Sequence, residues 1–210
     1  MENWRRLTKN RIKEFEILGK KKKVVFDFRP FLNLKVKSNW KSELAFCISV
    51  ANSSAISGLK FQKEIENTKI ESLSLKEIEK LLKKANVRFF KRKAFYIKKA
   101  LKNFEIVENA LKEESKIARE MLVKKIKGIG YKEASHYLRN LGRKDLAILD
   151  RHMLRWMFEN GYIEKIPRNL AKKKYLEIEK ILEEIAKREK KSLAVMDLDI
   201  WFRRTGRILK

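Results

Sequence analysis

The stretch Ile126-Lys-Gly-Ile-Gly-Tyr-Lys-Glu-Ala-Ser-His136 decides the fold of this chain. A helical pattern of apolar residues ends at Ile126, and a second pattern opens at Tyr131. Glycine on both sides of Ile129 lets the backbone turn tightly and approach a partner closely, because glycine has no Cβ. The sequence therefore predicts two helices joined by a tight hairpin over about residues 114–141, with Ile129 tucked between the helices.

This hairpin is either a plain turn between helices or a place that holds a phosphate group. Gly128, Ile129 and Gly130 precede the first turn of the second helix, where main-chain amides and the helix dipole favour negative charge. A DNA phosphate fits there without any reading of the base sequence. Two glycines around one residue do not decide between these alternatives, but the charge of the whole chain favours the phosphate site.

The composition favours a polyanionic partner. The 210 residues include 53 Lys and Arg against 27 Asp and Glu, which gives a net charge of +26. Nucleic acid is the simplest partner for so basic a protein. A membrane surface is the competing polyanion, but no apolar run suits a spanning helix, and the first residues lack the apolar stretch of a signal peptide. We therefore expect a cytoplasmic protein with no membrane partner.

Cysteine and histidine usage argues against a metal centre. Cys47 is the only cysteine, which excludes an intrachain disulfide and any four-cysteine iron–sulfur or zinc site. His136 and His152 have no Cys or His partner at metal-ligand spacing, so we expect them to be structural or close to DNA. Lys, Glu and Ile are abundant and Gln62 is the sole glutamine, a balance associated with proteins from very hot habitats.

The apolar pattern predicts an all-α fold. Only Pro30 and Pro167 interrupt the chain, and apolar residues recur at spacings of three and four through most segments. The segment 23–32 has the composition of a strand, but Pro30 makes an extended connection an equal alternative. The helices are predicted at about residues 7–19, 41–50, 53–66, 75–83, 91–103, 112–126, 131–141, 151–159, 170–187 and 193–201.

Lys132 and Asp150 are the candidate reacting groups. Lys132 lies in the first turn of the second hairpin helix, where the dipole and neighbouring cations favour a neutral, nucleophilic amine. Asp150 directly precedes a helical pattern and is predicted to be its N-cap. An amine and a carboxylate beside a DNA-binding hairpin suit attack at the anomeric carbon of a nucleotide, where the carboxylate stabilises oxocarbenium-like charge. Composition leaves two alternatives open: a solvated or phosphate-contacting Lys132, and a purely structural cap at Asp150.

The opening stretch, followed by Ile148-Leu-Asp-Arg-His152, resembles the core of the helix-hairpin-helix DNA glycosylases. Residues 44–58, 88–97 and 201–210 resemble the archaeal-type, or type 2, 8-oxoguanine DNA glycosylase/lyase, and the similarity spans most of the chain from about Trp40 onward. Lys127 stands where the superfamily often has proline, and the loop 142–149 lacks the usual proline. Neither departure removes a reacting group, and the lack of four cysteines separates the chain from iron–sulfur relatives.

The resemblance implies a single glycosylase unit over residues 1–210, built of two helical lobes around a DNA-binding cleft, with a catalytic aspartate loop at 142–150. It implies that Lys132 forms a Schiff base and that Asp150 is the other catalytic residue. The implied activity is excision of 8-oxoguanine from double-stranded DNA, followed by β-elimination at the sugar. The implied enzyme is a monomer without cofactor or metal. The alternatives are a glycosylase for another lesion and a noncatalytic DNA-binding protein.

Chemistry on a stacked base requires that the nucleotide be flipped out of the duplex. Local propensity assigns Asn52 and Ser53 to helix caps, whereas the resemblance implies a loop that meets the lesion gap or the opposite base, Asn52 more than Ser53. Arg92 and Lys93 precede an amphipathic helix and are candidates for phosphate contacts, with a solvated basic face as the alternative. The neighbouring aromatic residues are expected to anchor the core: Phe89 and Phe90.

Three residues near the end of the chain are candidates for binding the base. Asp197 and Trp201 lie four residues apart, so they share one helix face and place a carboxylate beside a large π surface. This pair could clasp a flipped purine, or Trp201 could lie in the core with Asp197 on the surface. The resemblance implies that the main-chain carboxylate of a terminal lysine helps recognise oxidised guanine, and Lys210 matches that lysine. An unmodified chain end is part of this expectation.

Overall fold

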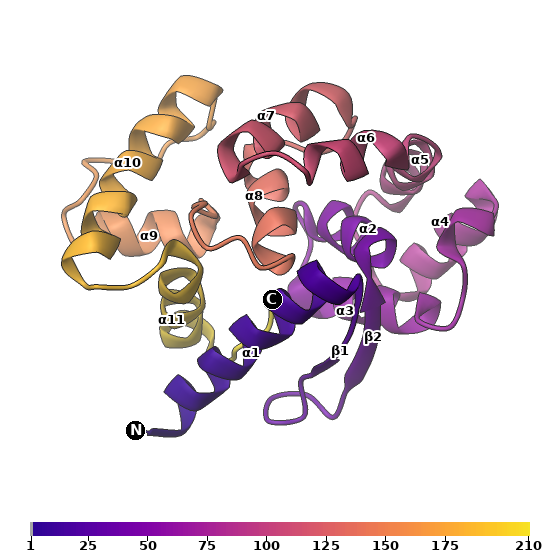
Figure 1. Ribbon diagram of the computed structural model, residues 1–210, viewed down its shortest axis with the longest axis horizontal. Helices are drawn as coiled ribbons and strands as arrows, with labels where there is room; N and C mark the ends of the chain where they lie inside the picture. The colour runs from indigo at the N-terminus through magenta and orange to yellow at the C-terminus, as the bar shows by residue number, and fades with distance from the viewer. Residues whose placement is uncertain (1) are drawn as a thin grey trace.

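The computed structural model describes residues 2–210 as a helical protein with one small sheet (Figure 1). The predicted helical fold is confirmed. In chain order the elements are α1 (Glu2–Lys21), β1 (Lys23–Asp27), β2 (Lys35–Asn39), α2 (Trp40–Val50), α3 (Ala55–Ile65), the 3-10 helix η1 (Ile70–Ser72), α4 (Leu75–Lys84), α5 (Phe90–Lys102), α6 (Phe104–Ala110), α7 (Ser115–Lys125), α8 (Tyr131–Asn140), α9 (Arg151–Glu159), α10 (Lys172–Arg188) and α11 (Leu193–Thr205).

The segment that the sequence left ambiguous forms a β-hairpin, so the strand is the correct alternative there. β1 and β2 pair antiparallel, and Phe26 lies opposite Val36 with both side chains buried. Pro30 lies in the connection between the strands, where no ladder hydrogen bond is lost. The sheet packs against α1 on one strand and α3 on the other.

One α-helix of the described chain, α6, was not predicted. α6 begins directly after Asn103, which is at once the C-cap of α5 and the N-cap of α6. No glycine or proline separates the two helices, so the apolar pattern gave no signal for a second start.

Two hydrophobic cores divide the molecule into two lobes. The first core is built by α1, the sheet and the helices α2 to α8, and the second by α9, α10 and the residues just before α9. α11 supplies residues to both, with Ala194 and Leu198 in the first core and Met196 and Ile200 in the second. Figure 1 shows α9, α10 and α11 gathered on one side of the molecule. The side chains of α11 therefore lie where the two lobes meet.

Candidate active site

The hairpin between α7 and α8 has the geometry that its glycines predict. Gly128 has φ 93°, in the left-handed region, and a Cβ there would lie 2.4 Å from the Cδ2 atom of Tyr96. Ile129 is buried in the first core, as predicted. Gly130 is the N-cap of α8, and its amide donates to the carboxylate of Glu133 over 3.2 Å. The hairpin is thus seated closely against α5, which carries Tyr96.

Lys132 lies in the first turn of α8, and its charge acts on buried groups of α5 and of α8 itself. Its side chain is 25% exposed, and its Nζ atom is 3.7 Å from Oε1 of Glu133. Burial lowers the pKa of Lys93 to about 8, and the charge of Lys132 is the next-largest cause. Burial holds the pKa of His136 well below its usual range, with further lowering by the charges of Arg139 and Lys132. The amine of Lys132 therefore lies among groups that are kept from solvent.

Asp150 is the N-cap of α9, as predicted. Its Oδ1 atom accepts a hydrogen bond from the main-chain amide of Met153 over 2.8 Å. Its own amide donates to the carbonyl of Ile148 over 3.0 Å. The residue is half-buried, so its carboxylate is held in one orientation while it stays partly open.

Asp197 is buried, so the alternative that placed it on the surface is wrong. Its Oδ2 atom lies 3.2 Å from Nη2 of Arg139. Burial raises the pKa of Asp197 to about 6; the charge of Arg139 opposes the shift, that of Asp150 adds to it and that of Lys132 opposes it. Both candidate reacting groups therefore act electrostatically on this one carboxyl group.

Arg139 is a residue of this cluster that the sequence reasoning missed. Lys132, His136 and Arg139 follow one another at spacings of four and three, which places them on one face of α8. Within the described chain, the buried Nε and Nη1 atoms of Arg139 have no hydrogen-bond partner. The helical spacing was visible in the sequence and would have identified this residue once Lys132 was chosen.

Trp201 lies one turn after Asp197 on α11 and is half-buried. Its ring meets the imidazole of His152 edge-on, with 4.8 Å between the ring centroids. Its indole Nε1 atom is buried, and residues 2–210 supply no hydrogen-bond partner for it. Since a buried indole N–H usually has a partner, this donor is suited to a ligand.

The Lys210 side chain is fully buried in the first lobe. Its Nζ atom donates to Oε2 of Glu43 over 2.7 Å and to Oε1 of Gln62 over 2.6 Å, and it lies over the rings of two buried phenylalanines. The main chain of Lys210 faces the imidazole of His136. Residue 210 is therefore fastened beside the face of α8 that carries Lys132.

Asn52 and Phe89 are exposed residues at the turning points of two loops. Both have left-handed backbone conformations, with φ 52° and 57°. They line a cavity of about 280 Å³ whose other lining residues include Ile48, Arg92, Lys93, Tyr96 and Gly128. Phe89 is 57% exposed, so its prediction as a core anchor is wrong, because the left-handed turn directs the ring outward. Phe90 packs on the first core, as predicted.

Neither Asn52 nor Ser53 caps a helix through its side chain. Ser54 is the N-cap of α3, and its Oγ atom accepts from the amide of Ser57 over 3.0 Å. The Oγ atom of Ser53 instead accepts from the amide of Arg88 over 2.8 Å. Ser53 therefore joins the loop after α2 to the loop before α5.

Lys93 and Arg92 occupy different environments although they are adjacent. Lys93 is 5% exposed, and its Nζ atom donates to the carbonyl of Ser49 over 2.7 Å and to Oγ of Ser53 over 3.1 Å. Arg92 is exposed. Lys93 therefore links α5 to the end of α2 through buried hydrogen bonds. Of these two residues, only Arg92 has its charge at the surface.

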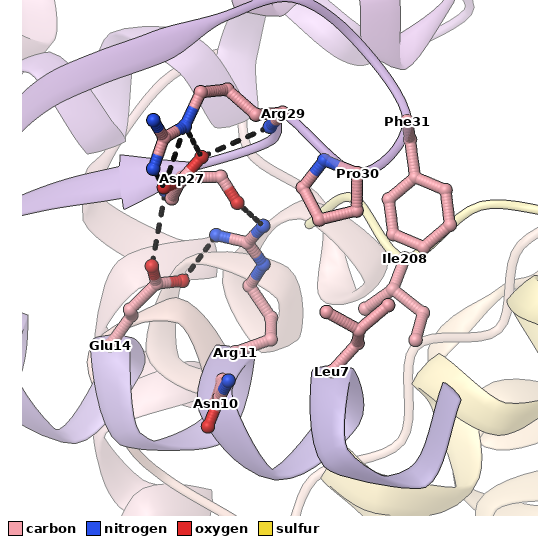
Figure 2. A pocket seen from close by; sticks show the side chains of 9 residues that line it. All are labelled: Leu7, Asn10, Arg11, Glu14, Asp27, Arg29, Pro30, Phe31 and Ile208. Carbon is pink, nitrogen blue, oxygen red and sulfur yellow. Dashed lines mark hydrogen bonds and ion pairs between the residues drawn. The ribbon is translucent and has the colours of Figure 1, made fainter. Parts of the chain in front are cut away.

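A larger cavity of about 470 Å³ lies between α1 and the end of β1 (Figure 2). Arg11 pairs there with Glu14 and donates to the carbonyl of Asp27 over 2.9 Å, while the Asp27 carboxylate accepts from Arg29. The charged groups of this cavity thus pair with one another, although the buried Nε atom of Arg11 has no partner in the described residues. Ile208 lines the cavity on the side of the chain end. None of the proposed reacting groups lines it.

Residues 2–210 contain no group of three or more His, Cys, Asp or Glu side chains that could hold a metal ion. The one cysteine, Cys47, is buried, and burial raises the pKa of its thiol well above the usual range.

No helix of the described chain combines the length and the apolar character needed to cross a membrane.

The glycine hairpin, the lysine that opens its second helix and the capped aspartate after it are the features of the helix-hairpin-helix DNA glycosylases. The model of the family described as 8-oxoguanine DNA glycosylase matches residues 10–191, and the chain belongs to this family.

Two similar proteins carry the name 8-oxoguanine DNA glycosylase/AP lyase. That of Methanocaldococcus jannaschii is 46% identical over 95% of this chain and 96% of its own length. That of Aquifex aeolicus is 42% identical over 95% of this chain and 91% of its own length.

Solved structures share the fold. The 8-oxoguanine DNA glycosylase of Thermotoga maritima superposes with a TM-score of 0.87 at 36% identity, covering all of this chain and 94% of that one. The M. jannaschii enzyme in complex with a 15mer DNA containing 8-oxoguanine gives a TM-score of 0.83 at 42% identity, covering 98% of this chain and 93% of that one.

Proposed function

We propose that this protein excises 8-oxoguanine from double-stranded DNA and then cleaves the strand at the resulting abasic site. The observation that carries the proposal is the arrangement of the glycine hairpin, Lys132 in the first turn of α8 and Asp150 as the N-cap of α9, in a chain of the 8-oxoguanine DNA glycosylase family. The names of the similar proteins support the same substrate, and the net charge of +26 suits a DNA duplex.

Lys132 supplies the nucleophile. Its neutral amine attacks C1′ of the flipped nucleotide, the C1′–N9 bond breaks, and the leaving base takes the electron pair and a proton. The negative charge of Asp150 stabilises the oxocarbenium-like charge on the sugar. Opening of the sugar ring gives a Schiff base between Nζ of Lys132 and C1′. Loss of a proton from C2′ then breaks the C3′–O bond, and water hydrolyses the Schiff base to release the amine.

Asp197, Trp201 and the main chain of Lys210 form the proposed base pocket. Oxidation gives guanine an N7–H donor where normal guanine has an acceptor. An anionic oxygen therefore favours the oxidised base and repels the normal one. We assign this role to the Asp197 carboxylate or to a main-chain carboxylate of Lys210. Trp201 supplies a stacking face and an indole N–H without a partner in the described residues.

The surface around the hairpin is the proposed DNA-binding side. The amides around Gly128, Ile129 and Gly130 suit a phosphate, and the exposed charge of Arg92 suits another. Asn52 and Phe89 project from neighbouring loops, and we assign them to the gap that the flipped nucleotide leaves. Ser53 and Lys93 support these loops from inside.

Borohydride trapping on a duplex with a single 8-oxoguanine tests the nucleophile. Borohydride reduces a Schiff base to a stable amine, so the wild-type protein should become cross-linked to the DNA. Lys132→Gln should bind the duplex without cross-linking, while Lys124→Gln, which changes an exposed lysine of α7, should cross-link normally. Normal trapping of Lys132→Gln would remove this lysine from the mechanism.

A panel of duplexes with other lesions separates the proposal from its alternatives. Excision of a different base in preference to 8-oxoguanine would identify a glycosylase for another lesion. Tight binding to every duplex with no excision and no cross-link would identify a noncatalytic DNA-binding protein.

The chain end is tested with three proteins: one that ends at Lys210, its C-terminal amide, and one with a short extension. Loss of the terminal carboxylate should strongly impair excision of 8-oxoguanine. Cleavage of a preformed abasic site should be less affected, because Lys132 is intact. Equal excision by all three proteins would leave Asp197 as the acceptor that reads the lesion.

We further propose that residues 1–210 act as one monomeric unit in the cytoplasm, without cofactor. The hairpin of about 114–141 and the loop 142–150 carry the reaction in this proposal. The support is the resemblance over nearly the whole length of the similar proteins. Light scattering of the protein bound to one duplex would test the monomer.

A further inference from the structure

We propose that Tyr175 of α10, together with Glu179, is a positioning residue that fixes the Asp150 carboxylate relative to Lys132. The inference rests on the proposed role of Asp150 in excision. It assigns a task to α10, which otherwise packs in the second core.

The loop that carries Asp150 has no helix or strand to satisfy its main-chain groups. Residues 142–150 are irregular, yet Ala147 and Leu149 are buried. A buried amide or carbonyl without a partner is costly, and side chains of α10 supply partners for Ala147. The amide of Ala147 donates to Oε1 of Glu179 over 3.0 Å, and its carbonyl accepts from the Tyr175 hydroxyl over 2.7 Å.

Tyr175 is suited to this task because its hydroxyl stays protonated and has several partners. The residue is 1% exposed, and burial raises its pKa, so the hydroxyl remains a donor at neutral pH. The same oxygen also receives a longer contact, 3.5 Å, from the amide of Leu149. One hydroxyl thus contacts the main chain at Ala147 and at Leu149, three residues and one residue before Asp150.

The same cluster reaches the residue beside the nucleophile. Glu179 is buried, and Arg119 of α7 binds its two carboxylate oxygens over 2.6 and 2.7 Å. The Arg119 guanidinium lies over the rings of Tyr131 and Tyr175, at 5.3 and 5.6 Å from their centroids. Tyr131 directly precedes Lys132. One buried cluster therefore contacts the chain next to both reacting groups.

This arrangement has a consequence for rate. A carboxylate that stabilises developing charge must be held within a fraction of an ångström, and a group on an irregular loop is held only by its anchors. Removing the Tyr175 hydroxyl frees the Ala147 carbonyl and loosens the loop, while the aromatic ring still fills the second core.

The test compares Tyr175→Phe with a matched control, Tyr137→Phe. Tyr137 is also fully buried, and its hydroxyl donates to a main-chain carbonyl, that of Trp40, over 3.2 Å in the first lobe. In single-turnover excision at saturating protein, Tyr175→Phe should be about tenfold slower than wild type with unchanged duplex affinity, and Tyr137→Phe less than about twofold slower. Equal slowing of both variants, or of neither, overturns the inference.

A double variant separates positioning from a general structural effect. If Tyr175 acts through Asp150, then Tyr175→Phe should cause no further slowing in an Asp150→Asn background. The same tenfold slowing in both backgrounds would show that Tyr175 acts independently of Asp150, and would overturn the inference. A wild-type rate for Asp150→Asn alone would instead refute the proposed role of Asp150, so the two failures are distinguishable.

Discussion

Asp150 and Asp197 carry the same side chain but occupy opposite environments in one site. Asp150 is half-buried, caps α9 and accepts from the amide of Met153. Asp197 is buried in the contact between the lobes, where it pairs with Arg139 and has a pKa of about 6. The difference shows that the surroundings of a carboxyl group decide its role. A capped carboxylate keeps its orientation, while a buried carboxyl group changes its protonation close to neutral pH.

The largest effect is expected from Asp150→Asn. Asparagine keeps the shape and can still cap α9, but it removes the negative charge that opposes the oxocarbenium-like sugar. Single-turnover excision should fall by about 100-fold or more, while affinity for the lesion duplex should be retained. Quench-flow or manual time courses at saturating protein measure the rate, and a binding titration is the control. An unchanged rate would show that Asp150 is only a structural cap and has no part in the reaction.

The pH dependence of excision tests Asp197. Below about pH 6 its carboxyl group is protonated, and above that pH it is a charged acceptor for the N7–H of the oxidised base. Excision should therefore rise as pH increases through about 6, and Asp197→Asn should lose this rise. Rates of both proteins from pH 5 to about 8 give the profile. A parallel profile for the two proteins would mean that another group causes the rise.

The same carboxyl group makes a prediction for stability. Its pKa is raised from the ordinary value of 3.8 to about 6 in the folded protein, so the folded state binds more protons between these pH values. The unfolding free energy of the wild type, relative to Asp197→Asn, should therefore fall by about 2 kcal/mol as pH rises from about 4 to 7. Denaturant titrations at several pH values measure the difference. A difference that stays constant with pH would show that Asp197 does not titrate in this range.

The sequence predicted correctly those features that depend on residues close to one another in the chain. The glycines around Ile129 specify the hairpin through backbone geometry alone, and Asp150 precedes its helix as an N-cap should. The contacts between distant segments had no such signal. Lys210 meets Glu43 across 167 positions in the sequence, and no periodicity links them.

Phe89 shows a second reason for failure. The sequence predicts that the ring of Phe89 anchors the core, but the residue has a left-handed φ of 57° and its ring is exposed. Non-glycine residues rarely adopt this conformation, so nothing in the residue type announced it. Arg139 was missed for a different reason. Its spacing from Lys132 puts it on the same face of α8, but the sequence does not show that Asp197 of α11 is its partner.

The contrast between an exposed and a buried group of like charge recurs on α5, where it predicts a smaller effect. Arg92 is exposed, whereas the Lys93 ammonium is bound inside by Ser49 and Ser53. A cation that neutralises a DNA phosphate releases a counterion, so Arg92→Met should lower the slope of log affinity against log salt by about one. Lys93→Met should leave the slope nearly unchanged, although it loosens the loop of Asn52. Fluorescence anisotropy on an undamaged duplex from low to moderate salt measures both slopes. An equal loss of slope in the two variants would show that Lys93 leaves its internal partners and contacts DNA. The burial of Lys93 would then not distinguish its role from that of Arg92.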